Sequence, residues 1–142
     1  PPLYYTAKMM ESFGTPPVVI LGFNSKEEMF LVEDFIALKC SIIVATADGS
    51  VGVKGTVVDA FKELMKLPNA AISHFYACGP EAMLKALYKA AYEEAGISGQ
   101  LSFEERMGCG FGACMGCSIE TKNGPKRICK DGPVLRTEEI LW

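Results

Sequence analysis

Residues 72–83 have the sequence ISHFYACGPEAM, in which a short apolar run leads into a glycine–proline turn and the start of a helix. The run is as long as a strand, and the residues after the turn have helical periodicity. Gly79 permits a tight turn, and Pro80 suits the first turn of a helix. We therefore expect a strand over residues 72–77 and a helix over residues 81–95, as in an α/β protein.

The same alternation of strand and helix extends towards the N-terminus. Further strands are expected at the apolar runs 18–21 and 41–46, which lack the polar alternation of a strand with one exposed face. Further helices are expected over residues 1–13, 25–38 and 56–67, the second of them capped by Ser25 and burying Met29, Val32 and Ile36. Short strands separated by helices of this length predict a parallel sheet with helices on both faces.

Composition and charge exclude several classes of function. The 142 residues carry a net charge of −3, so the chain lacks the basic surface that nucleic acid binding requires. No apolar run reaches the roughly 18 residues of a membrane span, and no secretory signal pattern is present, so we expect no membrane partner and a reducing, cytoplasmic compartment. His74 is the single histidine, which removes hydrolase triads, and we predict no catalytic acid or base.

Four of the six cysteines carry the strongest signal. Cys109, Cys114, Cys117 and Cys129 have the spacing C-x4-C-x2-C-x11-C, and plant-type [2Fe–2S] proteins begin with C-x4-C-x2-C. The interleaved glycines let the backbone curl so that its amides face the sulfurs. A structural zinc site and disulfides are the alternatives, although zinc sites usually show two CxxC-like pairs. The fourth cysteine is expected to follow a small hairpin formed by residues 119–121 and 126–128.

Two turns at predicted strand ends are candidates for nucleotide contacts, because ligands of open α/β sheets bind at the carboxyl ends of strands. One consists of Cys78, Gly79 and Pro80, and the other of Asp48, Gly49 and Ser50. Ordinary strand–helix and Asp-Gly turns are the alternative interpretation of both. We place a domain boundary near Gly99, with an α/β domain over residues 1–99, which the resemblance described next implies is a pyridine-nucleotide-binding domain, and a [2Fe–2S] domain over residues 100–142.

The cysteine segment resembles a known family. Residues 101–117, LSFEERMGCGFGACMGC, and residues 126–134, KRICKDGPV, resemble the electron-transfer subunit of class 1B dihydroorotate dehydrogenase. Residues 76–83 and 47–50 resemble the pyridine-nucleotide domain of the same family, which is of the ferredoxin-reductase type. The resemblance implies a doubly wound parallel sheet followed by a small irregular iron–sulfur domain with a short β-hairpin.

The resemblance also implies roles for individual residues. Cys109, Cys114, Cys117 and Cys129 match the cluster ligands, Cys78, Gly79 and Pro80 match the turn that faces the nicotinamide of NAD, and Asp48, Gly49 and Ser50 match a loop near the nucleotide. The family's subunit also contains an N-terminal barrel that binds FAD. We expect this chain to lack that barrel and the first strand of the nucleotide domain, so that FAD is bound mainly outside it.

The implied function is electron transfer in pyrimidine biosynthesis. Electrons pass from FMN of a dihydroorotate dehydrogenase catalytic subunit, the partner in a heteromeric complex, through the [2Fe–2S] cluster and FAD to NAD. The apolar residues Met107, Phe111, Ala113 and Met115 are expected either to contact that partner or to pack onto the nucleotide domain.

Two other functional classes stay open. One is a related subunit of a hydrogenase or a ferredoxin:NADP oxidoreductase, whose cluster segment often begins D-G-x-G-x-C. Cys109 stands at the position of that aspartate, which favours the dihydroorotate family. The other is a non-catalytic iron–sulfur or zinc module that mediates contact between subunits.

Overall fold

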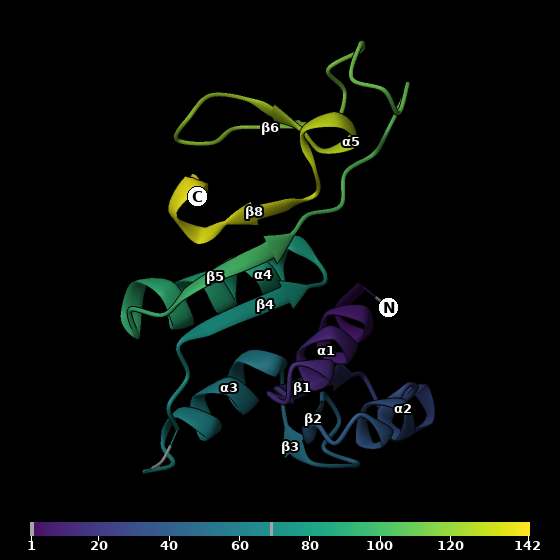
Figure 1. The fold of residues 1–142 in the computed structure, drawn as a ribbon, viewed down its shortest axis with the longest axis vertical. Coiled ribbons are helices and arrows are strands. Elements are labelled where there is room, and N and C mark those ends of the chain that lie inside the picture. The colour runs from purple at the N-terminus through teal and green to yellow at the C-terminus, as the bar shows by residue number, and fades with distance from the viewer. Residues whose placement is uncertain (1, 69) are drawn as a thin grey trace. The chain divides into compact units, whose positions relative to one another are not determined.

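The computed structural model describes residues 2–68 and 70–142, which form two compact units, Pro1–Ala71 and Ile72–Trp142. Each unit contains its own three-stranded sheet with helices packed on it (Figure 1). The predicted α/β class is therefore confirmed, but the strands of the described residues form two separate three-stranded sheets and a two-stranded hairpin, where the sequence predicted one parallel sheet. No helix in the described part of the chain is long and apolar enough to cross a membrane.

The first unit contains a fully parallel sheet. Its strands β1 (Val18–Phe23), β2 (Ser41–Thr46) and β3 (Val53–Lys54) lie in the order β1-β2-β3, with Val18 opposite Ser41. Its helices are α1 (Pro2–Ser12), α2 (Val32–Ala37) and α3 (Val57–Met65). The buried side chains of Ala7, Phe35 and Cys40 form the core under α1 and α2.

The helix predicted over residues 25–38 is wrong in extent and in its buried face. The structure has a short 3-10 turn, η1 (Lys26–Glu28), and then the separate helix α2. Leu31 has a left-handed backbone with φ of 60°, which interrupts the chain between them, and the Ser25 side chain makes no capping hydrogen bond. Because α2 starts later than expected, Phe35 is buried and Ile36 is 50% exposed.

Helix α3 begins directly after Thr56, the first residue of the predicted range, which acts as its N-cap. The backbone N–H of Thr56 donates to Asp59 Oδ2 at 2.7 Å, and the Thr56 hydroxyl accepts from the Asp59 N–H at 3.4 Å, which completes a capping box. Val57 packs closely against strand β1, since a Cβ added to Gly22 would lie 2.5 Å from Val57 Cγ1. The glycine at the end of β1 is therefore required by the start of α3.

The second unit has a mixed sheet. Its strands β4 (His74–Cys78), β5 (Ser98–Ser102) and β8 (Val134–Arg136) lie in the order β4-β5-β8, with β4 parallel and β8 antiparallel to β5. Helix α4 (Glu81–Leu87) continues into a π-helix, η2 (Tyr88–Glu94), which packs on β5 (Figure 1). The sequence predicted β4 and one continuous helix over 81–95, but not β5 or β8.

Strand β5 was hidden by Gly99, which stands where an apolar residue would face the core. A Cβ at this glycine would lie 2.4 Å from Cε1 of Phe75, so the ring on β4 occupies the space of a side chain. The domain boundary predicted at residues 99 and 100 falls inside β5, whereas the compact units divide after Ala71. The division by function at residue 99 stays a prediction.

The C-terminal part returns to the sheet after the cysteine segment. The predicted hairpin is present with shorter strands, β6 (Ser118–Ile119) and β7 (Lys126–Arg127), and a four-residue helix, α5 (Ile128–Asp131), precedes β8. After β8, the turn η3 (Thr137–Glu139) buries the Thr137 side chain, whose hydroxyl oxygen accepts a hydrogen bond from the Gly99 N–H at 3.0 Å. This bond joins β5 to the segment that follows β8.

Replacing Thr137 by valine keeps the shape of the side chain but leaves the buried Gly99 N–H without its acceptor. We expect Thr137→Val to lower the free energy of unfolding by about 1–3 kcal/mol. Urea denaturation followed by the fluorescence of Trp142 measures this, because its indole packs against Tyr88 and Phe103 of the same unit. The control Ser73→Ala removes an exposed hydroxyl and is expected to change stability by no more than about 0.5 kcal/mol. Equal stability of the two variants would contradict the role given to Thr137.

Candidate metal centre

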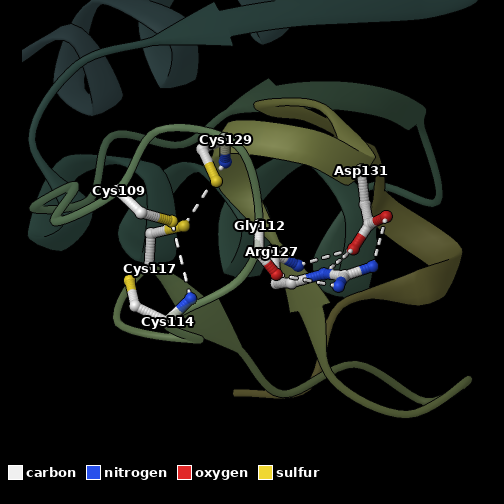
Figure 2. A network of polar contacts seen from close by, with 7 residues as sticks. All are labelled: Cys109, Gly112, Cys114, Cys117, Arg127, Cys129 and Asp131. Carbon is white, nitrogen blue, oxygen red and sulfur yellow. Dashed lines mark hydrogen bonds and ion pairs between the residues drawn. The ribbon is translucent and has the colours of Figure 1, made fainter.

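Three cysteines lie in an irregular segment and the fourth in a short helix. Cys109, Cys114 and Cys117 belong to residues 104–117, which form neither helix nor strand, and Cys129 lies in α5. Figure 2 shows the four cysteines in one part of the second unit, with the Cys114 sulfur turned away from the other three. The curl depends on left-handed backbone at Gly110, Gly112 and Met115, with φ of 72°, 90° and 61°.

The four thiols form two pairs. The Cys114 N–H donates to Cys109 Sγ at 3.5 Å, and the Cys129 N–H donates to Cys117 Sγ at 3.4 Å (Figure 2). A third amide, that of Gly116, donates to Cys114 Sγ at 3.4 Å. Amide donors of this kind stabilise negative charge on sulfur.

The amides shift the ionisation of the thiols. The N–H of Cys114, followed by that of Phe111, lowers the pKa of Cys109 to about 6. The N–H of Cys129 is the main cause that lowers the pKa of Cys117. The pKa of Cys129 is raised, first by its hydrogen bond to Cys117, then by burial and by the charges of Cys117 and Cys109. In the pair of Cys117 and Cys129, thiolate is therefore favoured on Cys117 and the proton on Cys129.

The donor set fits a centre with two metal atoms. Within residues 2–68 and 70–142, no three cysteine, histidine, aspartate or glutamate side chains converge closely enough to hold a single metal ion. Four thiols arranged as two pairs instead offer two thiolates to each of two metal atoms, as a [2Fe–2S] cluster requires. A structural zinc ion also takes four cysteine ligands, but it usually draws them from two CxxC-like pairs, which this spacing lacks.

A salt bridge between Arg127 and Asp131 lies beside the thiols, and sequence reasoning missed it. Arg127 Nε donates to Asp131 Oδ2 at 3.1 Å, and Arg127 Nη1 donates to the Gly112 carbonyl at 3.0 Å (Figure 2). The sequence signal for this salt bridge was the spacing of four residues between the opposite charges of Arg127 and Asp131, on either side of Cys129.

The first nucleotide candidate lies at the end of β4. Cys78 is exposed, Gly79 follows it, and Pro80 is the residue before α4. Gly79 and Pro80 line a hollow of about 310 Å³, whose other walls are Glu81, Leu84, Phe103, Glu104 and Glu105. The last three were not predicted, because they follow the unpredicted strand β5.

The second nucleotide candidate is a locally satisfied turn in the other compact unit. Asp48 Oδ1 accepts hydrogen bonds from the Ser50 N–H at 2.9 Å and from the Ser50 hydroxyl at 2.7 Å, and these bonds lower the pKa of Asp48. Ser50 Oγ in turn accepts from the Lys26 N–H at 2.9 Å. Gly49 between them has φ of 78°. These hydrogen bonds explain why Asp48, Gly49 and Ser50 occur in this turn, and no bound ligand is needed to explain them.

Comparison with known proteins confirms the relationship stated from the sequence. Residues 104–141 match the family described as the iron–sulfur cluster binding domain of dihydroorotate dehydrogenase B. The electron transfer subunit of dihydroorotate dehydrogenase B (NAD(+)) from Fusobacterium nucleatum is 42% identical over 142 residues, covering 99% of this chain and 53% of that protein. The corresponding subunit from Caldanaerobacter subterraneus is 39% identical and is covered over 55% of its length.

The chain thus spans about half the length of the curated relatives it matches. A solved structure is also similar: the NADH-dependent reduced ferredoxin–NADP oxidoreductase, described in relation to flavin-based electron bifurcation. It aligns with a TM-score of 0.84 and 31% identity, covering 99% of this chain and 49% of that one.

The amide hydrogen bonds predict selective reactivity of Cys109. In the metal-free chain, we expect alkylation of Cys109 by iodoacetamide to rise with a midpoint near pH 6, because the thiolate is the reactive form. Peptide mapping by mass spectrometry measures the modified fraction at each pH. In urea the amides no longer face the sulfur, and the midpoint is expected to move to the ordinary cysteine range, about 8.5. The same midpoint with and without urea would contradict this origin of the shift.

Proposed function

We propose that this chain is the NAD-linked and cluster-binding part of a dihydroorotate dehydrogenase B electron-transfer subunit. It relays electrons between FMN of the dihydroorotate dehydrogenase subunit and NAD, through a [2Fe–2S] cluster and FAD. The observation that carries the proposal is the arrangement of four thiols in two pairs with amides donating to three of the sulfurs. As the sequence indicated, a reducing, cytoplasmic compartment suits these free thiols.

Cys109 and Cys114 supply one pair of ligands, and Cys117 and Cys129 supply the other. The bound cluster would accept and donate one electron at a time. It would thereby connect carriers that exchange single electrons with carriers that exchange electron pairs. The chain's own contribution is to hold the thiolates and to stabilise their charge with the amides of Cys114, Gly116 and Cys129. No acid or base of the chain is required, which agrees with the single histidine.

The hollow at the end of β4 is the proposed site for the nicotinamide end of NAD. Gly79 lets a ligand approach the backbone, and Phe103 offers an apolar wall. Three carboxylates, those of Glu81, Glu104 and Glu105, also line the hollow, and they oppose binding of the pyrophosphate there. They suit the ribose hydroxyls, which are hydrogen-bond donors. Cys78 and Pro80, on either side of Gly79, are proposed to face the nicotinamide as well.

The remaining cofactor assignments follow from the family. Asp48, Gly49 and Ser50 are proposed to lie near the nucleotide, and FAD is proposed to be bound mainly by parts of the subunit other than this chain. We also propose that the fold is the doubly wound nucleotide domain of the ferredoxin-reductase type, which the similarity to the ferredoxin–NADP oxidoreductase structure supports.

A second candidate function is that of a ferredoxin–NADP oxidoreductase subunit. It is favoured by the structural similarity, which extends over 99% of this chain. Cys109 argues for the dihydroorotate family, because related oxidoreductase subunits often have an aspartate at its position. Electron donors distinguish the two: the proposal requires reduction by the FMN subunit of dihydroorotate dehydrogenase, and the alternative requires exchange with reduced ferredoxin.

The ligand assignment predicts which cysteine variants lose the cluster. After anaerobic reconstitution with iron and sulfide, we expect the chain to absorb in the visible range, Cys114→Ser to lose this absorbance, and Cys40→Ser to retain it. Cys40 is the matched control, because it is a buried cysteine of the other compact unit. Absorbance spectra with iron and sulfide analysis provide the measurement. Retained absorbance in Cys114→Ser, or stoichiometric zinc in place of iron, would refute the assignment.

Exposed apolar residues around the thiols predict the surface for the FMN subunit. Met107, Phe111 and Met115 are 53%, 71% and 48% exposed, so Phe111 does not pack onto the rest of its unit. We expect Phe111→Asp and Met115→Asp to reduce pull-down of that subunit by the cluster-loaded chain at least tenfold. Leu67→Asp, at a residue of similar exposure in the other compact unit, is the control. Undiminished association of both variants would show that this surface does not form the contact.

A further inference from the structure

One arginine side chain connects the two segments that carry the thiols. Its Nη1 donates to the Gly112 carbonyl, in the middle of the loop between Cys109 and Cys114 (Figure 2). The rest of the Arg127 guanidinium pairs with Asp131, through Nε to Oδ2 at 3.1 Å and Nη2 to Oδ1 at 3.3 Å. The Arg127 N–H also donates to Asp131 Oδ2 at 2.9 Å, which closes the turn around Cys129.

The loop approaches α5 closely at the point where the arginine holds it. Gly112 is buried with φ of 90°, and a Cβ there would lie 3.0 Å from Lys130 Cβ and 2.6 Å from Lys130 Cδ. Only glycine therefore allows the Gly112 carbonyl to meet Arg127. The side chains of Arg127 and Asp131 are 27% and 31% exposed, so this bidentate pair is more sheltered than an ordinary surface salt bridge.

The guanidinium charge belongs to the segment that carries the second thiol pair, because Arg127 lies two residues before Cys129, whose N–H donates to Cys117 Sγ. Asp131, two residues after Cys129, offsets part of this charge through both of its carboxylate oxygens. The two opposite charges thus lie on either side of Cys129 in the chain.

We propose that Arg127 is a positioning residue for the cluster: it fixes the loop of Cys109 and Cys114 against the turn of Cys129, and its charge, balanced by Asp131, sets the reduction potential. The proposal rests on the iron–sulfur function proposed above. Two separable effects follow. Loss of either partner loosens the thiols, whereas the potential responds to the sign of the charge removed, because reduction adds one negative charge to the centre.

The test uses the reconstituted 142-residue chain and two readouts: the rate at which a chelator bleaches the visible absorbance, and the reduction potential from a spectroscopic redox titration. We expect Arg127→Gln to bleach about 10–100-fold faster and to have a more negative potential. Asp131→Asn is expected to bleach faster but to have a more positive potential. The double variant should bleach fast with a potential near that of the unsubstituted chain, since the net charge is restored.

Two further variants serve as controls. Arg127→Lys keeps the charge but not the planar fork, so its potential should stay while bleaching accelerates. Lys126→Gln removes the same charge one residue away, from an ion pair with Glu139 that is equally sheltered, with Lys126 29% exposed. Because the Lys126 charge is paired with Glu139 at 2.7 Å, we expect bleaching to stay unchanged and the potential to shift less than in Arg127→Gln.

The outcomes separate this inference from the proposed function. If the unsubstituted chain takes up no cluster, the iron–sulfur function itself is wrong. If it does, and Arg127→Gln bleaches no faster or Lys126→Gln changes as much, the positioning role is overturned. Potentials that shift in the same direction in Arg127→Gln and Asp131→Asn overturn the charge effect. If Arg127→Gln holds no cluster, the bleaching rates and potentials of Asp131→Asn and Arg127→Lys are compared with those of the unsubstituted chain in its place. Bleaching that is no faster in either variant then overturns the positioning role.

Discussion

The structure around the thiols depends on one constraint: four sulfurs that carry negative charge when they bind metal must be held together by a segment without helix or strand. Backbone amides meet this constraint, because those of Cys114, Gly116 and Cys129 donate to sulfurs at 3.4–3.5 Å. The amides can face inward only where the backbone takes left-handed conformations, as at Gly110 and Gly112. The glycine content, the thiol pairing and the lowered pKa values of Cys109 and Cys117 are therefore consequences of the same geometry.

The sequence was most informative where the chemistry is local. The spacing of Cys109, Cys114, Cys117 and Cys129 predicted their grouping, because three thiols within nine residues can converge only through a curled backbone. Helix α3 was equally predictable from the sequence, because Thr56 and Asp59 form a capping box without contacts to distant residues. The strands β1, β2 and β4 could also be predicted, because buried parallel strands appear in the sequence as short apolar runs.

Features that depend on distant contacts were not predictable in this way. Strand β5 contains Gly99 because Phe75, a residue of another strand, fills the space of its side chain. The buried face of α2 was predicted wrongly because Leu31 interrupts the helix. An apolar side chain such as that of Leu31 gives no sign in the sequence of a left-handed backbone. Arg127 was overlooked because one of its partners, the Gly112 carbonyl, lies 15 residues away and carries no side chain to signal it.

The antiparallel strand β8 fixes both ends of the excursion that carries the cysteines. Ser102, the last residue of β5, lies opposite Val134, the first residue of β8, and the Phe103 N–H donates to the Pro133 carbonyl at 2.7 Å. The chain thus leaves the sheet and re-enters it at neighbouring positions, with both ends of the excursion already fixed by strand pairing. An insertion of this geometry is portable: its length and contents can change during evolution, or be exchanged by design, without altering the register of the strands that support it.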